Sequence, residues 1–270
     1  EYGSPTLTHC SFSDNAGLGM YNFASNATVT NCSFTRNMGG MFNNILSNTT
    51  VTNCSFIGNM GGGIINSLNN TTVTNCTFRG NQATSGGGIN NGYGSPTITN
   101  CAFSGNTSTR GGGMSNYNSN ATVSNCVFGG NQAGEGGGMY NYGSSPTVAN
   151  CVLWGDTPPE TANIAGSHPS VPTVRFSDIR GGLPVGAIDG GGNFDLDPMF
   201  VRPPDPGPDG AWDGVNDDYG DLRLRGGSPC IDAGDPGFVP EPGETDLDGH
   251  ARMLCGWVDM GAYEFGIGDY

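Results

Sequence analysis

The chain has 270 residues, including 48 Gly and 17 Pro, and charged residues make up only 12% of it. It contains no lysine, which excludes a lysine Schiff base, a lysine general base and a P-loop lysine. The net charge of −15 disfavours binding to nucleic acid and to anionic lipid, and no apolar run is long enough for membrane insertion.

A repeat dominates the first part of the chain. Its middle copies read Thr-Val-Thr-Asn-Cys-Ser-Phe-x-x-Asn, followed by Gly-Gly, then Met or Ile, and a further Asn. The unit is too short and too rich in Gly for a helical repeat, and it lacks the Leu positions of leucine-rich repeats. It predicts an all-β fold, a parallel β-helix (β-solenoid) with three short strands and three bends in each coil. Seven copies align, beginning at Thr6, Thr28, Thr50, Thr72, Thr97, Thr122 and Thr147.

Side-chain parity predicts where the first bend lies. In a continuous strand Val29 would point away from the face that Cys32 and Phe34 share, so the chain must turn at Asn31. Asn tolerates left-handed backbone angles, and its amide can bond the equivalent amide of the next coil. The sequence therefore predicts an asparagine ladder, with His9 as its first member, made by Asn31, Asn53, Asn75, Asn100, Asn125 and Asn150.

Two more ladders are expected at the other two bends. One follows the Phe strand and consists of Asn15, Asn37, Asn59, Asn81, Asn106 and Asn131. The other follows the Met/Ile strand and consists of Asn22, Asn43, Asn66, Asn91, Asn116 and Asn141. The spacing of the copies grows from 22 to 25 residues in the middle of the chain. We expect the extra residues, near Thr84-Ser85 and Ser108-Thr109, to be loop padding, and a binding site is the alternative.

Columns of like residues should fill the interior of the coils. Phe34, Phe56 and Phe78 belong to a stacked aromatic column, and seven Cys, among them Cys32, Cys54 and Cys76, recur at one inward position. We expect these thiols to stay reduced and to pack as small apolar groups. A metal-binding thiolate column is the alternative, and it is disfavoured because stacked buried thiolates repel one another.

Residues 1–182 are expected to form the coils, which become degenerate after residue 154, and residues 183–270 to form an irregular acidic cap. Cys230 and Cys255 lie outside the repeat and could form a disulfide, in agreement with an oxidising compartment. The cap is rich in carboxylates, so calcium is the one cofactor to consider. The candidate ligands are Asp217, Asp218, Asp246 and Asp248. No segment has the spacing of an EF-hand, and a solvated acidic turn region is the alternative.

Several motifs of the cap resemble a known family. They include Asn193-Phe-Asp-Leu-Asp-Pro-Met-Phe200, Gly227-Ser-Pro-Cys-Ile-Asp-Ala-Gly-Asp235 and Val258-Asp-Met-Gly-Ala-Tyr-Glu-Phe265. They resemble the tail of secreted bacterial right-handed parallel β-helix proteins with a choice-of-anchor type C-terminal region, common in planctomycete-like bacteria. The repeats are similar to those of polymorphic outer-membrane proteins and related adhesins. The resemblance implies an exported or cell-surface protein, mostly without an assigned reaction.

Two classes of function are open at this stage. Many β-solenoids cleave acidic polysaccharides, so a polysaccharide lyase or hydrolase is the alternative. That chemistry needs paired carboxylates, or calcium and a base, on neighbouring coils. The repeats do not offer such residues. We therefore expect no catalytic residues and favour an extracellular structural or adhesive protein. Its expected partners are further copies of itself, stacked head-to-tail into a filament or packed laterally, and cell-surface polysaccharide.

Overall fold

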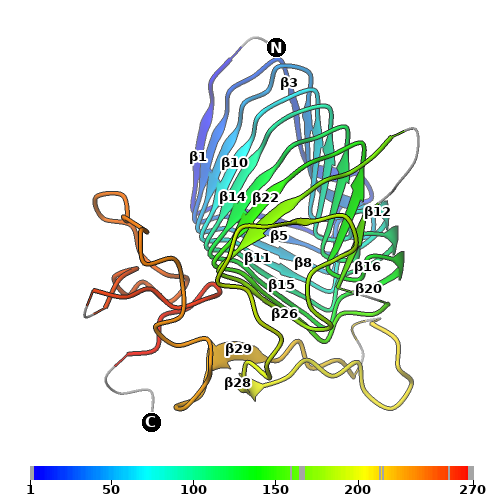
Figure 1. Ribbon diagram of the computed structural model, residues 1–270. Coiled ribbons are helices and arrows are strands. Elements are labelled where there is room, and N and C mark those ends of the chain that lie inside the picture. The colour runs from blue at the N-terminus through cyan, green and yellow to red at the C-terminus, as the bar shows by residue number, and fades with distance from the viewer. Residues whose placement is uncertain are drawn as a thin grey trace.

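The computed structural model describes residues 3–158, 160–163, 168–212, 214, 216–254 and 256–266. These residues form a parallel β-solenoid in which each coil adds one strand to each of three long sheets, here called sheets A, B and C (Figure 1). The all-β prediction and the three strands per coil are therefore confirmed. A segment after the last coil lies outside the solenoid, as expected for the C-terminal region.

The three sheets run along the whole column. Sheet A contains, in spatial order, β1 (Thr6–Thr8), β4 (Thr28–Thr30), β7 (Thr50–Thr52), β10 (Thr72–Thr74), β14 (Thr97–Thr99), β18 (Thr122–Ser124), β22 (Thr147–Ala149), β25 (Thr173–Arg175) and β27 (Ile188–Asp189). Sheet B contains β2 (Ser11–Ser13), β5 (Ser33–Thr35), β8 (Ser55–Ile57), β11 (Thr77–Arg79), β15 (Ala102–Ser104), β19 (Val127–Gly129), β23 (Val152–Trp154) and β26 (Asp178–Ile179). Sheet C contains β3 (Leu18–Phe23), β6 (Gly39–Asn44), β9 (Ile64–Ser67), β13 (Ile89–Gly92), β17 (Met114–Tyr117), β21 (Met139–Tyr142) and β24 (Thr161–Asn163).

Like residues stack over like residues, as the repeat predicted. Val29 pairs in register with Val51, and Phe34 with Phe56, and both columns are fully buried. The Phe rings stack nearly parallel, with centroids 4.8 Å apart between Phe34 and Phe56 and 4.9 Å apart between Phe56 and Phe78. This spacing is the ordinary distance between neighbouring strands, so the core repeats rung by rung without distortion.

The three asparagine columns differ in their role. Asn31 and its equivalents have φ between 51° and 53°, so this column forms the bend that parity predicted. Apart from the exposed Asn15, the second and third columns are buried, and they carry the continuous amide chains, for example Asn59 Nδ2 to Asn81 Oδ1 at 2.9 Å and Asn91 Nδ2 to Asn116 Oδ1 at 2.9 Å. At the second corner the left-handed residue precedes the Asn, and Gly80 is one example. The buried amides cap backbone groups that the turns leave unpaired.

The three additional residues of the longer coils are not loop padding. They form a fourth parallel sheet, sheet D, which contains β12 (Gln82–Ser85), β16 (Thr107–Arg110) and β20 (Gln132–Glu135). The Gly residues before sheet C allow this packing. A Cβ atom on Gly88 would lie 2.5 Å from the Gly113 carbonyl oxygen of the next coil, so only Gly fits there.

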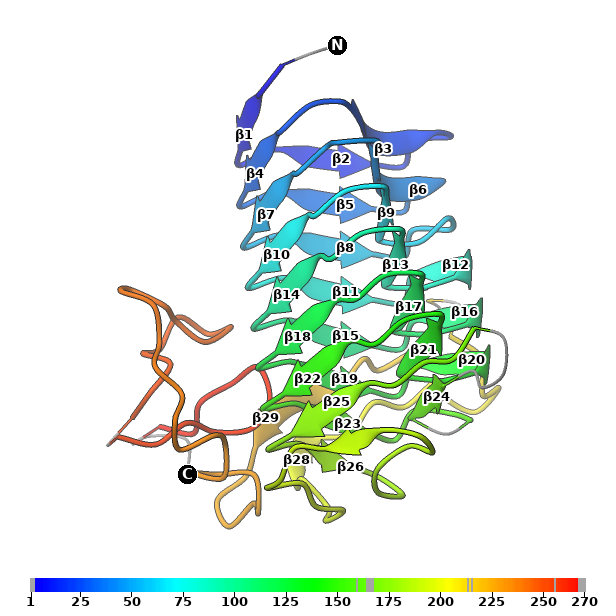
Figure 2. The same ribbon diagram turned by 45° about the horizontal axis from the view of Figure 1, so that its top comes forward.

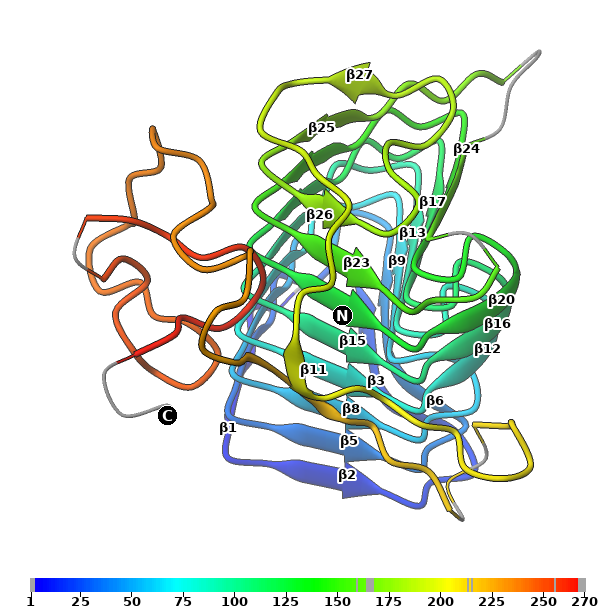
Figure 3. The same cartoon turned by 60° about the horizontal axis from the view of Figure 1, so that its bottom comes forward.

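The solenoid continues past residue 182, because β27 extends sheet A with Ile188 opposite Thr173. The following segment, residues 199–266, is here called the C-terminal arm. It begins with the antiparallel pair β28 (Phe200–Arg202) and β29 (Asp221–Leu224) beneath sheet B, and it then lies beside the corner between sheets A and B (Figure 2). Sheet D projects from the opposite flank (Figure 3). Among the described residues, no helix is long and apolar enough to cross a membrane.

The arm docks on the solenoid through a second hydrophobic core. Ala102, Val127 and Val152 point outward from sheet B and are buried against Leu222 and Met260 of the arm. The bend column supplies polar contacts: Asn100 Nδ2 donates to the Thr245 carbonyl oxygen at 3.0 Å, and Asn150 Oδ1 accepts from the Asp235 amide at 2.8 Å. The bend asparagines of the middle coils therefore anchor the arm, which is a role the sequence did not reveal.

Candidate functional site

The four candidate calcium ligands make other interactions. Asp217 Oδ2 accepts hydrogen bonds from the Gly214 amide at 2.7 Å and from the Tyr219 hydroxyl at 3.3 Å. Asp218 forms an ion pair with Arg202 at 2.5 Å, which holds the pKa of Asp218 below its usual value. These contacts use the carboxylates to fix turns of the arm.

Asp246 lies in another part of the arm, where it is buried and accepts the backbone amides of Asp248, His250 and Glu264 at 2.7 to 3.0 Å. Asp248 is exposed, although the burial of its surroundings raises its pKa. In the part of the chain that the structure describes, no three His, Cys, Asp or Glu side chains converge on one point. The predicted calcium site thus has no converging ligand set among the described residues, because Asp217 and Asp218 lie in one part of the arm and Asp246 and Asp248 in another.

The cysteines are placed as follows. The thiols of the inward column are free and donate to nearby carbonyl oxygens, as Cys54 Sγ does to the Thr52 oxygen at 3.2 Å. Burial raises the pKa of the Cys101 thiol. Cys230 is a buried free thiol, 3.3 Å from Asp178 Oδ2, while Cys255 lies outside the described residues. The structure therefore offers small buried thiols rather than exposed nucleophiles in these columns.

One buried carboxyl pair ends the second ladder. Asp156 stands where the next Asn would be, and its Oδ1 accepts from Asn131 Nδ2 at 2.8 Å. Glu160 accepts the backbone amides of residues 155 and 156. Burial raises the pKa of Asp156 to about 6 and that of Glu160 to about 10. Asp156 therefore ends the second ladder, because the last amide, that of Asn131, needs only an acceptor.

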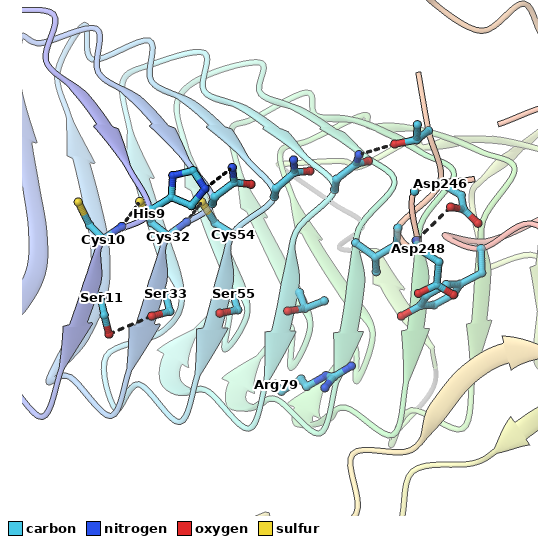
Figure 4. Close-up of a pocket in the computed structure, with 18 residues that line it drawn as sticks. His9, Cys10, Ser11, Cys32, Ser33, Cys54, Ser55, Arg79, Asp246 and Asp248 are labelled. Carbon is cyan, nitrogen blue, oxygen red and sulfur yellow. Dashed lines mark hydrogen bonds between the residues drawn. The ribbon is translucent and has the colours of Figure 1, made fainter. Parts of the chain in front are cut away.

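Two surface grooves remain as candidate sites. The first, here called the arm groove, has a volume of about 840 Å³ and lies between the early coils of sheet B and the tip of the arm. Figure 4 shows Ser11, Ser33 and Ser55 in a row along it, with Asp246 and Asp248 facing them from the arm. Backbone amides bind the carboxylate of Asp246, so Asp248 supplies the carboxylate of this groove that a ligand could contact. The groove therefore has no pair of carboxylates arranged for acid and base catalysis.

The second groove, here called the tyrosine groove, has a volume of about 530 Å³. Its floor is the outer face of sheet C in the middle coils, with Tyr93, Tyr117 and Tyr142, and its wall is sheet D, with Ser85 and Arg110. The wall exists only where the coils have the longer period, because the three additional residues build it. The earlier coils share the sheet C face but lack sheet D.

The tyrosines form a ladder along the floor. Tyr117 and Tyr142 stack at 4.9 Å with an interplanar angle of 2°, and Tyr93 meets Tyr117 edge-on at 5.5 Å. The in-register pairing of β17 with β21 sets the stacked pair one rung apart. Tyr93 and Tyr117 are exposed, at 54% and 41%. The groove therefore presents aromatic rings to solvent along the solenoid axis.

One basic side chain sits over the aromatic floor. The Arg110 guanidinium lies 5.7 Å from the centre of the Tyr140 ring and also forms an ion pair with Glu135 at 3.4 Å. The hydrogen bond with Tyr93 raises the pKa of Tyr117, and burial raises that of Tyr140. Both phenols are thus neutral at physiological pH and can donate and accept hydrogen bonds.

The sequence predicted neither the groove nor the arm contact. Two signals were present. The longer period marked the coils that carry sheet D, and the outward column of sheet B changes from Ser11, Ser33 and Ser55 to Ala102 and Val127 where the arm covers it. A polar column that turns apolar on an outer face indicates a covering segment.

One family model agrees with this architecture. No curated protein matches the sequence. Among solved structures, a trypsin-treated variant of QnrB1, a plasmid-mediated fluoroquinolone resistance protein, matches with 12% identity and a TM-score of 0.23, covering 73% of this chain and 92% of that one. The profile of the family described as "Right handed beta helix region" matches residues 1–78 and 64–164. The chain therefore belongs to the right-handed β-helix family.

Proposed function

We propose that the protein is an extracellular adhesive β-helix of the bacterial surface, and that its tyrosine groove binds neutral polysaccharide. The observation that carries the proposal is the aromatic ladder of Tyr93, Tyr117 and Tyr142 beside the wall of sheet D, in which Tyr93 and Tyr117 are exposed. The resemblance of the repeats and tail motifs to secreted surface proteins supports the location.

The chemistry of the groove suits sugar rings. The apolar face of a sugar packs on an aromatic ring, while its hydroxyls need donors and acceptors around the rim. The phenol groups of Tyr117 and Tyr140, the Ser115 hydroxyl and the Asn90 amide line the groove and supply them. Because the rings repeat along the axis, a linear chain can contact several of them at once, which adds weak contacts into useful affinity.

Charge favours a neutral ligand over an acidic one. The whole chain carries a net charge of −15, which repels polyuronates at long range. Arg110 is the basic residue of the groove, and its ion pair with Glu135 offsets its charge. Hydrolysis needs two carboxylates arranged on opposite sides of the scissile bond, and Glu135 is held in its ion pair with Arg110. The groove therefore favours binding over cleavage.

Head-to-tail stacking into filaments belongs to the same proposal. Within the column each coil stacks edge to edge on the next through sheets A, B and C, and a second copy would continue the same pairing. Sedimentation velocity of residues 1–270 tests it: mass that grows with concentration supports stacking, and a monomer at every concentration refutes it.

The groove is tested by affinity electrophoresis and calorimetry with soluble β-glucan, with polygalacturonate as the acidic comparison. We expect the variant Tyr117→Ala/Tyr142→Ala to lose at least tenfold in affinity for β-glucan. Tyr21→Ala is the matched control, because Tyr21 is exposed on sheet C but outside the groove. No binding by the natural sequence, or equal loss in the control, refutes the proposal. Release of reducing or unsaturated ends would support the enzyme instead.

A further inference from the structure

The outer face of sheet A carries a regular array of threonines. In each strand from β1 to β14 the first and third residues are Thr, and they point outward on either side of an inward Val, Leu or Ile. The first column is unbroken over eight strands: Thr6, Thr28, Thr50, Thr72, Thr97, Thr122, Thr147 and Thr173. The second contains Thr8, Thr30, Thr52, Thr74, Thr99 and Ser124. We call this surface the threonine face.

The β-propensity of Thr does not account for the array. The outward positions of sheet B are mixed, for example Ser55, Arg79 and Gly129, and those of sheet C include Tyr117 and Asn90. All three sheets have the same strand geometry, so strand formation alone tolerates many residues at these positions. A uniform choice on one sheet only indicates a requirement of that surface.

The threonine face is open to solvent and uncharged. Thr28, Thr50, Thr97, Thr122 and Thr147 of the first column are exposed. From β1 to β22, sheet A contains no charged residue, although the chain has 33 acidic and basic residues in all; the first charge on it is Arg175. The arm contacts Asn75 and Asn100, which directly follow Thr74 and Thr99 of the second column. At the end of that column Ala149 is buried and Arg175 pairs with Asp235.

The hydroxyls of the face are available to a ligand. Among the described residues, Thr99 Oγ1 and Ser124 Oγ share a hydrogen bond of 3.2 Å. The other hydroxyls of the two columns have no hydrogen bond to a described protein group. Each rung from β1 to β10 thus offers two methyl groups and two hydroxyls toward water, without a competing partner among the described residues.

The face is also rigid and evenly spaced. The Phe column of the neighbouring sheet B repeats at 4.4 to 4.9 Å over five contacts, and the amide ladders lock each coil to the next. The longer period does not disturb it, since Thr72 pairs directly with Thr97 across the first long coil. The additional residues lie in sheet D, on another side of the solenoid.

These observations together form a two-dimensional lattice. Rungs lie about 4.8 Å apart, and the two columns lie about 6 to 7 Å apart because two residues of a parallel strand separate them. These two repeats are close to the two perpendicular oxygen repeats on a prism face of hexagonal ice. Water molecules held between the methyl groups and bonded to the hydroxyls would therefore take up positions that an ice surface can continue.

We propose that the threonine face binds ice. Each Thr contributes little to the affinity for ice, but the rigid array presents all its contacts at once. The side chains are already ordered when the protein folds, so binding costs little further entropy. A flat uncharged face suits this ligand, because charged groups would hold water in orientations that ice does not share. The proposal goes beyond polysaccharide binding, and it concerns a different face of the solenoid.

The test compares thermal hysteresis and uptake into a slowly growing ice hemisphere. We expect residues 1–270 to shape ice crystals, to show hysteresis and to be enriched in the ice. The variant Thr72→Tyr/Thr97→Tyr, which places two rings in the middle of the face, should lose at least fivefold in hysteresis. Its matched control is Thr84→Tyr/Thr109→Tyr, because both residues are exposed threonines of sheet D.

Circular dichroism and thermal unfolding verify that each variant is folded. If the Tyr variant does not fold, Thr72→Ser/Thr97→Ser removes two methyl groups, keeps both hydroxyls, and should reduce hysteresis at least twofold. Exclusion of the natural sequence from ice, or an equal loss in the sheet D control, overturns the proposal. The variant Tyr117→Ala/Tyr142→Ala should keep its ice activity, so failure of the polysaccharide proposal and failure of this one are distinguishable.

Discussion

Removing one amide from the second ladder should destabilise the whole column. We consider Asn81→Ala, in the middle of the buried chain of amides. Asn81 Oδ1 accepts from the backbone amide and from Nδ2 of Asn59, at 3.1 and 2.9 Å. Its own Nδ2 donates to the Phe56 carbonyl oxygen and to Asn106 Oδ1, both at 2.9 Å. The substitution therefore removes four hydrogen bonds from a fully buried position.

The size of the effect depends on which groups keep another partner. Asn59 Nδ2 still donates to the Phe34 oxygen, and Asn106 Oδ1 still accepts from the backbone amide of residue 81. The backbone amide of Asn59 is left buried without an acceptor, which costs about 1 to 3 kcal/mol. The substitution also removes the remaining hydrogen bonds and leaves a small cavity. We therefore expect the free energy of unfolding to fall by about 3 to 5 kcal/mol in total.

The assay is urea unfolding followed by circular dichroism, with hydrogen exchange to locate the effect. The midpoint should fall at an unchanged denaturant slope, and amide protection should fall most in the coils next to Asn81, because each coil contacts only its neighbours. Asn70→Ala is the control, since Asn70 is exposed and accepts one hydrogen bond, from the Ser95 amide at 2.8 Å. Equal stability of the two variants would refute the assignment of the ladder as a main source of stability.

Three further predictions concern other parts of the molecule. Because burial raises the pKa of Glu160 to about 10, the contribution of this residue to stability is complete below pH 4.5 and is lost as the pH rises toward 10. Unfolding measured across this range should therefore show a smaller loss of stability in Glu160→Gln than in the natural sequence. Arg252→Met leaves Glu264 buried without its ion pair of 2.9 Å and should cost about 3 to 5 kcal/mol, seen as faster proteolysis of the arm, whereas adding Glu264→Gln should recover part of the loss. Gly88→Ala should cost about 1 to 3 kcal/mol in thermal unfolding, and Gly92→Ala, where the nearest atom lies 3.6 Å from the new Cβ, should cost clearly less.

The site was less predictable than the fold. The outward position of Tyr117 and Tyr142 could be predicted from their place in the repeat. Their groove could not, because its wall consists of residues such as Arg110 in an extension that looks like ordinary loop sequence. Whether a Gly-rich extension forms a loop or a strand depends on its neighbours in the stack, since a single short strand has no stability of its own.

The amino-acid sequence by itself determined the solenoid. Its repeat places Val, Phe, Cys and Asn at fixed intervals, and only rungs stacked in register bury all of these columns together, as Phe34 on Phe56 illustrates. Tertiary structure decided where the arm lies and what the outer faces can bind. Those features depend on contacts between distant segments, such as Asn100 with Thr245, and no local period in the sequence encodes such a contact. The contacts between coils recur in every repeat, so the sequence period reveals them. A docking contact occurs once, so no period reveals it.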